Sequence, residues 1–370
     1  MKTVVISANT SWYLFNFRRN TILELLNIGY KVIAVAPYDD YSFRLKELGA
    51  TFVNVDIDQG GTNAFKDFRT LFQFVSIYKK NKPDVVLNFT PKNNIYSTIA
   101  ASISGAKSIN NIAGLGLVFV HESYTSKLVR LMYRVSQKKA AKIFFQNNDD
   151  LSLFLKYNLA PSSICERIPG SGVDLTRFSV VHPNNDGVVR FLLIARMLYD
   201  KGIGHFVEAA ATLKSKYGSN VEFNLLGQLD VKNPSAVSKC QMQQWVNDGI
   251  VNYLGTSDSV EEVIGNSDCI VLPSFYREGV PKSLLEAGAM GKPIITTDNV
   301  GCRETVDEGI NGFLCIPRCS NSLISKIESM LNLSHQERIE MGRKSREKVE
   351  REFDERVVIS KYIEAVKCCF

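Results

Sequence analysis

Two carboxylates separated by eight positions, Glu278 and Glu286, lie in the stretch EGVPKSLLEAGAMG. The apolar run DCIVLPSF before them predicts a buried strand, and Pro281 is typical of a first helical turn, where its missing N–H costs nothing. We expect Glu278 on the loop and Glu286 just over one turn inside the helix. A helix N-terminus favours an anion, and carboxylates accept hydrogen bonds from hydroxyl groups. This chemistry fits a nucleotide sugar, although the spacing alone is also common for two surface glutamates.

Two cations follow the strand predicted at Val188–Ala195: Arg196 and Lys201, in the sequence RMLYDKG. Parallel strands present the loops at their carboxyl ends to ligands, and Gly202 lets the backbone bend there. Arginine can bind phosphate oxygens in a bidentate manner, whereas lysine acts as a point charge. The pair can therefore bind a diphosphate; considered alone, the two residues are equally typical of solvated loop charges.

Other candidate ligand-binding residues follow further predicted strands. In GSGVDLTRF, Gly170 and Gly172 allow a tight turn. Gln228 follows the strand VEFNLLG, and Asn233–Ser235 belong to the next loop, where contact with a base or diphosphate and an ordinary polar loop are both consistent with the sequence. The predicted residues for binding this ligand are Glu286, Gly279, Val280, Pro281, Lys282, Leu285, Gly227, Gln228 and Gly172.

Apolar runs alternate with helical segments along the chain, which indicates βαβ units and parallel sheets. In the first half the predicted strands are Thr3–Ser7, Lys31–Pro37, Thr51–Val55, Asp84–Phe89, Ile143–Phe145 and Ile164–Ile168. In the second half they are Val188–Ala195, Val221–Gly227, Ile250–Tyr253, Cys269–Pro273, Pro293–Thr297 and Gly312–Pro317. The breaker-rich stretch Ser179–Gly187 predicts a linker. We therefore predict domains over residues 1–178 and 188–352, with a C-terminal helix over 353–370.

Length and composition agree with two globular domains. The chain has 370 residues, of which 45% are hydrophobic and 22% charged, and it is longer than a typical single core. No apolar run approaches 18 residues and no leader is visible, so we expect neither a transmembrane span nor export. The eight cysteines lack a CxxC pair, which favours free thiols in a reducing cytoplasm over metal ligands or lipid sites. The net charge of +6 suits an anionic partner without requiring nucleic acid.

The stretch EGVPKSLLEAGAMGKP resembles the signature EGFPxxxLEAxAxGxP of retaining glycosyltransferases with the GT-B fold, in particular family 4. Two further motifs match this family: the R-x4-K pair of RMLYDKG, and GSGVDLTRF, which is similar to GNGVDxxRF. The resemblance is strongest over Gly170–Pro317. It implies an α/β architecture of two Rossmann-like domains with parallel sheets that face each other across a cleft. The first would bind the acceptor and the second the nucleotide sugar, and the C-terminal helix would cross back to the first.

The resemblance also implies roles for the candidate residues. Glu286 would hold the ribose hydroxyls of the donor. The catalytic residues would be Arg196 and Lys201, which neutralise the leaving diphosphate, and Glu278, which holds a hydroxyl of the sugar. Transfer would retain the anomeric configuration by departure and attack on one face. No metal or other cofactor is expected, because the cation pair serves the diphosphate and no Asp-x-Asp triplet is expected to present paired carboxylates to a divalent ion.

Within family 4, the first half of the chain resembles enzymes of capsule, O-antigen and N-glycan precursor synthesis, which extend a saccharide linked to undecaprenyl diphosphate. The likeness rests on TPKNNIYSTIAA (90–101) and NIAGLGLVF (111–119). It implies transfer of a hexose or N-acetylhexosamine, from UDP or alternatively GDP. The acceptor-side candidates are Arg18, Lys92, Asn93 and Gly114. Many relatives have a histidine where this chain has Ala113, and the sequence leaves open which residue replaces it.

A basic helix is predicted within Tyr124–Lys142. Its cations Lys127, Arg130, Arg134 and Lys138 recur at three- and four-residue spacing and so share one face, flanked by apolar positions. One interpretation is a solvated helix packed on the sheet. The other is a face that contacts anionic lipid headgroups on the inner side of the cell membrane, where each cation contributes about 1 kcal/mol.

Two other functions are also compatible with the sequence. An epimerase of the GT-B fold that acts on a UDP-sugar shares the architecture, and so does a non-catalytic partner of another transferase. The non-catalytic partner is expected to lose the cation pair or the glutamate pair, and this chain has both.

Overall fold

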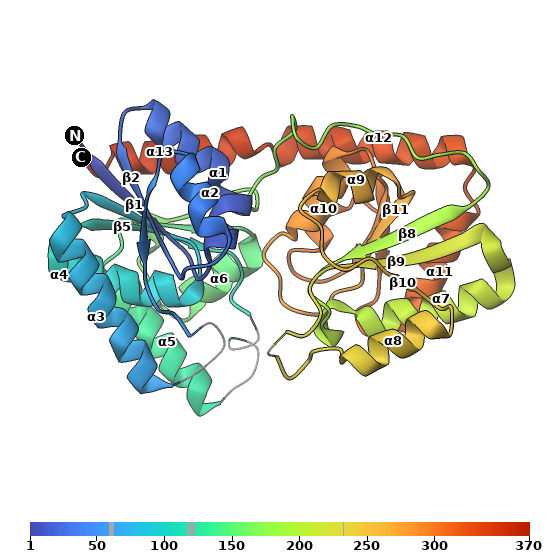
Figure 1. Cartoon of the computed structure of the whole chain (residues 1–370), viewed down its shortest axis with the longest axis horizontal. Helices are drawn as coiled ribbons and strands as arrows, with labels where there is room; N and C mark the ends of the chain where they lie inside the picture. The colour runs from blue at the N-terminus through green and yellow to red at the C-terminus, as the bar shows by residue number, and fades with distance from the viewer. Residues whose placement is uncertain (59–62, 117–118, 120–122, 232) are drawn as a thin grey trace. The chain divides into compact units, whose positions relative to one another are not determined.

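The computed structural model describes residues 1–58, 63–116, 119, 123–231 and 233–370, with the side chain of residue 125 left aside. The chain divides into two compact units (Figure 1). The first domain comprises Met1–Ser171 and Arg356–Phe370, and the second comprises Gly172–Glu355. The division lies before Phe178, the predicted end of the first domain, because Val173 and Phe178 pack in the core of the second.

The first domain contains a seven-stranded sheet with the order β3-β2-β1-β4-β5-β6-β7. Its strands are β1 (Thr3–Ser7), β2 (Lys31–Ala36), β3 (Thr51–Asn54), β4 (Val85–Asn88), β5 (Lys107–Ile112), β6 (Lys142–Phe145) and β7 (Cys165–Arg167). All neighbouring strands pair in parallel. The direction of the strand order reverses between β1 and β4, the place where open α/β sheets bind ligands.

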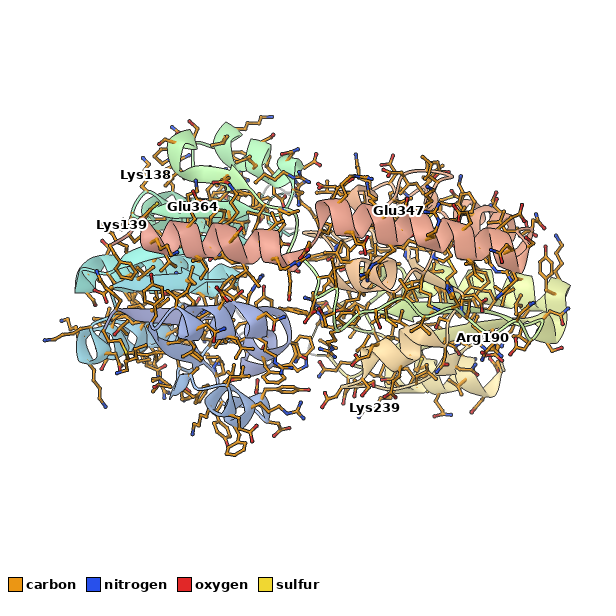
Figure 2. The ribbon with its side chains drawn as sticks, turned by 90° about the horizontal axis from the view of Figure 1, so that it is seen from above. Lys138, Lys139, Arg190, Lys239, Glu347 and Glu364 are labelled. Carbon is orange, nitrogen blue, oxygen red and sulfur yellow. The ribbon has the colours of Figure 1, made fainter. Side chains whose placement is uncertain are left out.

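Helices cover both faces of this sheet, because each face has its own apolar core. They are α1 (Ser11–Asn27), α2 (Tyr41–Glu47), α3 (Ala64–Asn81), η1 (Asn93–Ser97), α4 (Thr98–Ser104), α5 (Tyr124–Gln137), α6 (Asn148–Lys156), η3 (Ser162–Ile164) and α13 (Glu355–Lys367). Lys138 and Lys139 directly follow α5 (Figure 2). In α13, the ring of Tyr362 lies 5.5 Å from Phe89 and 5.3 Å from Phe144, measured between centroids. The predicted return of the C-terminal helix to the first domain is confirmed.

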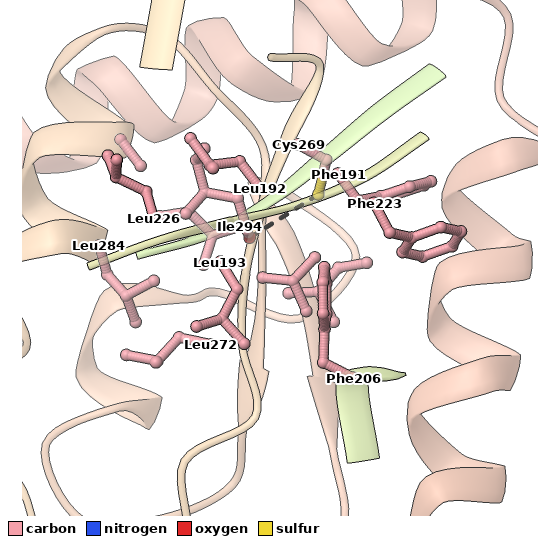
Figure 3. Close-up of a cluster of buried hydrophobic side chains, with 14 of the residues drawn as sticks. Phe191, Leu192, Leu193, Phe206, Phe223, Leu226, Cys269, Leu272, Leu284 and Ile294 are labelled. Carbon is pink, nitrogen blue, oxygen red and sulfur yellow. Dashed lines mark hydrogen bonds between the residues drawn. The ribbon is translucent and has the colours of Figure 1, made fainter. Parts of the chain in front are cut away.

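The second domain repeats this architecture with a six-stranded parallel sheet in the order β10-β9-β8-β11-β12-β13. Its strands are β8 (Val189–Ile194), β9 (Val221–Leu226), β10 (Asn252–Tyr253), β11 (Cys269–Leu272), β12 (Ile294–Thr297) and β13 (Gly312–Cys315). Its helices are η4 (Tyr199–Lys201), α7 (Ile203–Tyr217), η5 (Gly218–Asn220), α8 (Lys239–Asn247), α9 (Val260–Gly265), α10 (Lys282–Ala289), η6 (Arg303–Thr305), α11 (Ser320–Leu331) and α12 (His335–Glu352). In its core, Phe191 stacks on Phe223, which also contacts Phe206 (Figure 3).

The prediction of two Rossmann-like domains with parallel sheets is confirmed. The sequence pattern nevertheless misses one strand, β5, because Ser108, Asn110 and Asn111 interrupt its apolar run. In the structure Asn110 is fully buried, and its side chain forms hydrogen bonds with Asn88 and Gln137 at 2.9 and 2.6 Å. A central strand can therefore include amides when its neighbours satisfy them. Among the described residues, no helix is both long and apolar enough to cross a bilayer.

Candidate functional site

The strand and the helix predicted around the two glutamates both form. Glu278 lies on the loop between β11 and α10, and Glu286 lies in the second turn of α10. Pro281 caps α10 instead of lying within its first turn, because its φ of −62° fits but its ψ of 121° is still extended. The N-terminus of α10, which favours an anion, therefore follows closely after Glu278.

Glu278 already has partners within the second domain. Its carboxylate forms an ion pair with the Lys201 ammonium group and accepts a hydrogen bond from the Ser274 hydroxyl at 2.9 Å. Both charged side chains are largely buried, with 15% of Lys201 and 12% of Glu278 exposed. Loss of one charge would leave the other desolvated and unpaired, which is costly. The fold thus joins one predicted cation and one predicted carboxylate in a single pair.

Arg196, the second predicted cation, lies between β8 and η4, and its side chain is exposed. Its charge acts on Tyr276. Burial and the nearby Glu278 raise the pKa of the Tyr276 phenol, and Arg196 opposes this shift. Lys201 Nζ lies 5.4 Å from the centroid of the same ring. Both cations and one carboxylate therefore lie near Tyr276.

Close backbone contacts hold these loops together. Gly202 follows the cation pair with a φ of +81°, and a Cβ there would collide with the carbonyl oxygen of Pro273. Gly301, on the loop after β12, has a φ of +79°, and a Cβ there would collide with the carbonyl oxygen of Gly279. Only glycine meets both conditions. The loops after β8, β11 and β12 are thus packed backbone against backbone beside Glu278.

Glu286 differs from Glu278 because its carboxylate forms no hydrogen bond or ion pair with the described residues. Burial raises the pKa of this carboxyl group to about 7, against the opposing charges of Lys282 and Arg177. A carboxyl group that titrates near neutral pH is typical of functional sites. Its oxygens can therefore accept hydrogen bonds from the hydroxyl groups of a ligand.

The motif GSGVDLTRF lies beside the start of α10. The carbonyl oxygen of Gly172 accepts a hydrogen bond from Lys282 Nζ at 3.4 Å. Arg177, which the sequence analysis did not select, forms an ion pair with Glu261 at 2.9 Å and is one of the charges that act on Glu286. Its place in a matched motif was the available signal.

Sequence reasoning also missed three polar side chains that support the Glu278 loop. Besides Ser274, these are Thr297, which donates its hydroxyl to the carbonyl oxygen of Ser274, and Asn299, whose amide donates to the carbonyl oxygen of Tyr276 at 2.9 Å. Thr297 ends β12 and Asn299 follows two residues later. Their position at the carboxyl end of a parallel strand was the signal that could have identified them.

The remaining predicted residues of the second domain are Val280, Leu285, Gly227, Gln228 and the loop 233–235. The side chains of Val280 and Leu285 are buried in the core, so only their backbones can face a ligand. Gly227 directly follows β9, and a Cβ there would collide with the carbonyl oxygen of Ala195. Gln228 follows with an exposed side chain, and its carbonyl oxygen accepts a hydrogen bond from Met197 N at 2.9 Å. In the next loop, the Ser235 hydroxyl accepts a hydrogen bond from the backbone of Asp200, so this loop supports η4.

Comparison with known families assigns both halves of the chain. Residues 176–348 match the family described as glycosyl transferases group 1, and residues 3–147 match the family described as glycosyl transferase 4-like. The chain belongs to the glycosyltransferases.

Curated relatives align with this glycosyltransferase over most of its length. It is 27% identical over 367 residues to N,N'-diacetylbacillosaminyl-diphospho-undecaprenol alpha-1,3-N-acetylgalactosaminyltransferase of Campylobacter jejuni, which covers 95% of this chain and 94% of the relative. It is also 27% identical over 266 residues to UDP-Gal:alpha-D-GlcNAc-diphosphoundecaprenol alpha-1,3-galactosyltransferase of Escherichia coli, covering 67% of this chain and 66% of the relative. Anabaena HepE, solved in complex with UDP-glucose, shares the fold with a TM-score of 0.79 and 15% identity over 100% of both chains.

The first-domain candidates of the glycosyltransferase are built into the interior of that domain. Asn93 is fully buried; its amide oxygen accepts a hydrogen bond from the Thr90 hydroxyl at 2.7 Å, and its amide nitrogen donates to the Ser7 hydroxyl at 3.1 Å. Lys92 forms an ion pair with Asp67 at 2.5 Å, and both side chains are less than one-fifth exposed. These contacts link the start of η1 to β1 and to α3.

Arg18 and Gly114 complete the predicted acceptor set. The Arg18 side chain is buried, with its guanidinium carbon 4.2 Å from the ring centroid of Phe89 and one amino group donating to the Tyr13 hydroxyl at 3.1 Å. Gly114 has a φ of +130° in the loop after β5. The motif around it, NIAGLGLVF, lies partly outside the described residues, at positions 117–118.

One Asp-x-Asp triplet does occur in the glycosyltransferase, at residues 56–58. In the structure Asp56 accepts hydrogen bonds from Arg69 and Gln73, both at 2.9 Å, and Asp58 forms an ion pair with Lys66 at 3.5 Å. The three partners lie on α3. Both carboxylates are thus engaged by neighbouring side chains, and independence from metal stays a prediction.

Proposed function

We propose that this glycosyltransferase moves a hexose or N-acetylhexosamine from a UDP-sugar to a saccharide carried on polyprenyl diphosphate, in the synthesis of a bacterial surface polysaccharide. The proposal rests on one arrangement in the second domain: at the carboxyl ends of its strands lie Arg196, Lys201, Glu278 and Glu286. Two observations on relatives support it. The Campylobacter and Escherichia enzymes are both named for acceptors linked to diphospho-undecaprenol, and the second is named for UDP-Gal.

The mechanism begins with the leaving group. As the bond between the anomeric carbon and the diphosphate breaks, its electron pair moves to the phosphate oxygen. Cations and helix N-termini aimed at such a developing charge lower the barrier, because they are fixed before the reaction starts. When the donor binds, the Lys201 ammonium group leaves its ion pair with Glu278 and pairs with the diphosphate. Arg196 binds the same diphosphate. The N-terminus of α10 adds its partial positive charge.

The carboxylates orient the donor. Once Lys201 turns to the diphosphate, Glu278 accepts a hydrogen bond from a sugar hydroxyl, and Glu286 accepts from the ribose hydroxyls. The acceptor hydroxyl then forms its bond to the anomeric carbon on the face that the diphosphate leaves, and its proton passes to the departing phosphate oxygen. The products are the extended saccharide, with retained configuration, and UDP.

A radiolabelled assay tests the proposal. Purified protein is incubated with labelled UDP-N-acetylhexosamine and UDP-hexose donors, with and without a lipid-diphosphate saccharide in detergent. The proposal expects labelled lipid only when the acceptor is present. Conversion to an epimeric UDP-sugar without acceptor would identify an epimerase instead, and an unchanged donor in every mixture would identify a non-catalytic protein.

A further inference from the structure

Tyr276 lies two residues before Glu278, on the loop between β11 and α10. Hydrogen bonds hold its backbone in place. Its N–H donates to the carbonyl oxygen of Asp200 at 3.1 Å and to the Ser274 hydroxyl at 3.3 Å, and its carbonyl oxygen accepts from the Asn299 amide at 2.9 Å. The backbone of this tyrosine is therefore positioned before a ligand binds, which reduces the cost of binding.

The hydroxyl group of Tyr276 differs from those of two other tyrosines packed in the two domains. The Tyr253 hydroxyl donates to the carbonyl oxygen of Gly227 at 2.9 Å, and the Tyr362 hydroxyl donates to the Asn111 amide oxygen at 3.0 Å. A buried tyrosine usually has such a partner. Tyr276 is also partly buried, yet its hydroxyl forms no hydrogen bond with the described residues. This hydroxyl is therefore available to a ligand.

The charges around the ring of Tyr276 determine which ligand its hydroxyl can bind. Lys201 Nζ lies 5.4 Å from the ring centroid, and the charge of Arg196 acts on the same phenol. Burial, Glu278 and Asp200 raise the pKa of the phenol above its ordinary value of 10, and Arg196 opposes them. The hydroxyl thus keeps its proton at neutral pH and can donate a hydrogen bond. Beside two cations, this donor fits an oxygen atom of an anion.

The ring of Tyr276 contacts Lys201 as well. The Lys201 ammonium group lies over the ring while it is paired with Glu278, and only 15% of the lysine side chain is exposed. In the proposed mechanism this ion pair breaks when the donor binds. A desolvated cation is still attracted to the face of an aromatic ring after it has lost its carboxylate. The ring can therefore hold Lys201 in the site while the lysine changes partners.

We propose that Tyr276 is a further donor-binding residue: its hydroxyl donates a hydrogen bond to the diphosphate of the nucleotide sugar, and its ring holds the Lys201 ammonium group beside the same diphosphate. The inference rests on the proposed function, which supplies the nucleotide sugar. It concerns the diphosphate alone and does not depend on the base, the sugar or the acceptor.

Equilibrium titrations with UDP and with uridine test the inference without a transfer reaction. Tyr276→Phe removes only the hydroxyl and should weaken UDP binding by about tenfold or more, because a hydrogen bond to a charged group is lost. Uridine has no phosphate, so its affinity should be the same in wild type and in this variant. Tyr276→Leu also removes the ring and should weaken UDP binding by a further factor of about two to five.

Tyr217, at the far end of α7, provides a matched control because it combines the same features away from the candidate site. Lys216 Nζ lies 5.1 Å from the centroid of its ring and forms an ion pair with Glu328 at 2.7 Å. Tyr217→Phe and Tyr217→Leu should leave UDP affinity unchanged. Thermal unfolding checks the fold of each variant. If Tyr276→Leu unfolds, Tyr276→Phe, which keeps the ring, decides the inference alone.

Two results would overturn the inference. Tyr276→Phe could bind UDP as tightly as wild type does, which would remove the hydroxyl from the diphosphate site. It could instead lose affinity for UDP and uridine equally, which would show that the tyrosine only supports the loop.

Failure of this inference is distinguishable from failure of the proposed function. If wild type binds GDP in place of UDP and Tyr276→Phe weakens GDP binding, the inference stands and the UDP donor is wrong. If the expected loss for UDP is found in a protein that only epimerises the donor, the inference stands and transfer is wrong. Wild type that binds no nucleoside diphosphate would overturn both.

Discussion

The two domains place polar side chains at the carboxyl ends of similar parallel sheets and use them differently. In the second domain these residues are charged, and Arg196 and Glu286 have no ion-pair partner within the described residues. In the first domain, amides and hydroxyls of Ser7, Asn88, Ser97, Asn110 and Gln137 form hydrogen bonds with one another. The comparison teaches that similar sheets can carry a charged cluster with unpaired members in one domain and a neutral network of hydrogen bonds in the other.

The network of the first domain is neutral. The Ser7 hydroxyl donates to the Asn88 amide oxygen at 2.7 Å, and the Ser97 hydroxyl donates to the same oxygen at 2.6 Å. The Asn88 amide nitrogen donates to Asn110, which in turn donates to Gln137. All five side chains are fully buried. Such a network stabilises the domain only as long as every member is satisfied.

Replacing Lys201 should have the largest effect on the second domain. If Lys201 acts on the charge that develops on the leaving diphosphate, Lys201→Ala should lower the turnover number by about 10²–10³ and weaken donor binding much less. Steady-state kinetics and donor titration measure the two effects. The control is Lys239→Ala, which removes an exposed lysine that pairs with the exposed Asp230. It should change neither the turnover number nor donor binding. An increase in the Michaelis constant with turnover intact would move the leaving-group role to Arg196 or to α10.

Replacing Asn110 should affect stability and leave chemistry alone. Asn110→Ala removes hydrogen bonds to Asn88 and Gln137 and leaves their buried groups unsatisfied, which costs about 1–3 kcal/mol in the free energy of unfolding. Denaturant unfolding should show this loss, and donor affinity should stay at the wild-type value. The exposed Asn27, at the end of α1, provides the control. Asn110→Ala with normal stability and altered donor affinity would contradict the contrast between the domains.

A smaller effect is expected for Ser274, which positions Glu278 by a hydrogen bond without forming an ion pair. Ser274→Ala should lower the turnover number by roughly 2–13-fold, the equivalent of about 0.5–1.5 kcal/mol. Ser274→Thr keeps the hydroxyl and should recover most of that loss. Equal losses in both variants would show that the hydroxyl does not hold the carboxylate.

No effect is expected from chelation. If Arg196 and Lys201 supply the positive charge for the diphosphate, as proposed, transfer should continue at the wild-type rate in excess EDTA. Rates measured with EDTA, and then with added magnesium or manganese, check this prediction. Loss of activity in EDTA with recovery by metal would show that the cation pair does not serve the diphosphate alone.

Much of the second domain could be predicted because its motifs are local. EGVPKSLLEAGAMG defines a loop and a helix start, and the structure places Glu278 and Glu286 on them as expected. The pairing of Lys201 with Glu278 could not be predicted, because 77 positions separate the two residues and only the sheet brings their loops together. Arg177 and Asn299 were missed although a matched motif and the carboxyl end of a parallel strand were available as signals.

The first domain was harder to predict because polarity there does not indicate exposure. Lys92, Asn93 and Arg18 look like ligand contacts in the sequence, yet ion pairs, hydrogen bonds and aromatic rings hold them inside the domain. The exposed phenylalanines of α3 show the converse. Helical periodicity identifies an apolar stripe but does not say which of two stripes packs on the sheet, so Phe65 and Phe68 could not be separated from the core by sequence alone.

The pH dependence of donor binding tests most directly whether the second domain recognises the nucleotide sugar through Glu286. Burial raises the pKa of this carboxyl group above its ordinary value of 4.5 to about 7, so the unliganded protein should lose stability as pH rises between these values. Donor affinity should instead rise with pH over this range, because both oxygens of the carboxyl group accept hydrogen bonds from hydroxyl groups only when it is ionised.

Calorimetric titration of a UDP-sugar from about pH 5.5 to 8.5 gives the result. For wild type, affinity should be constant above about pH 7 and fall by about tenfold per pH unit below it. Glu286→Gln should bind the donor about 10–150-fold more weakly at high pH, since charge-assisted hydrogen bonds contribute about 1.5–3 kcal/mol, and should show no such dependence. A flat profile for wild type, or full affinity in Glu286→Gln, would contradict the assignment of Glu286 to the donor.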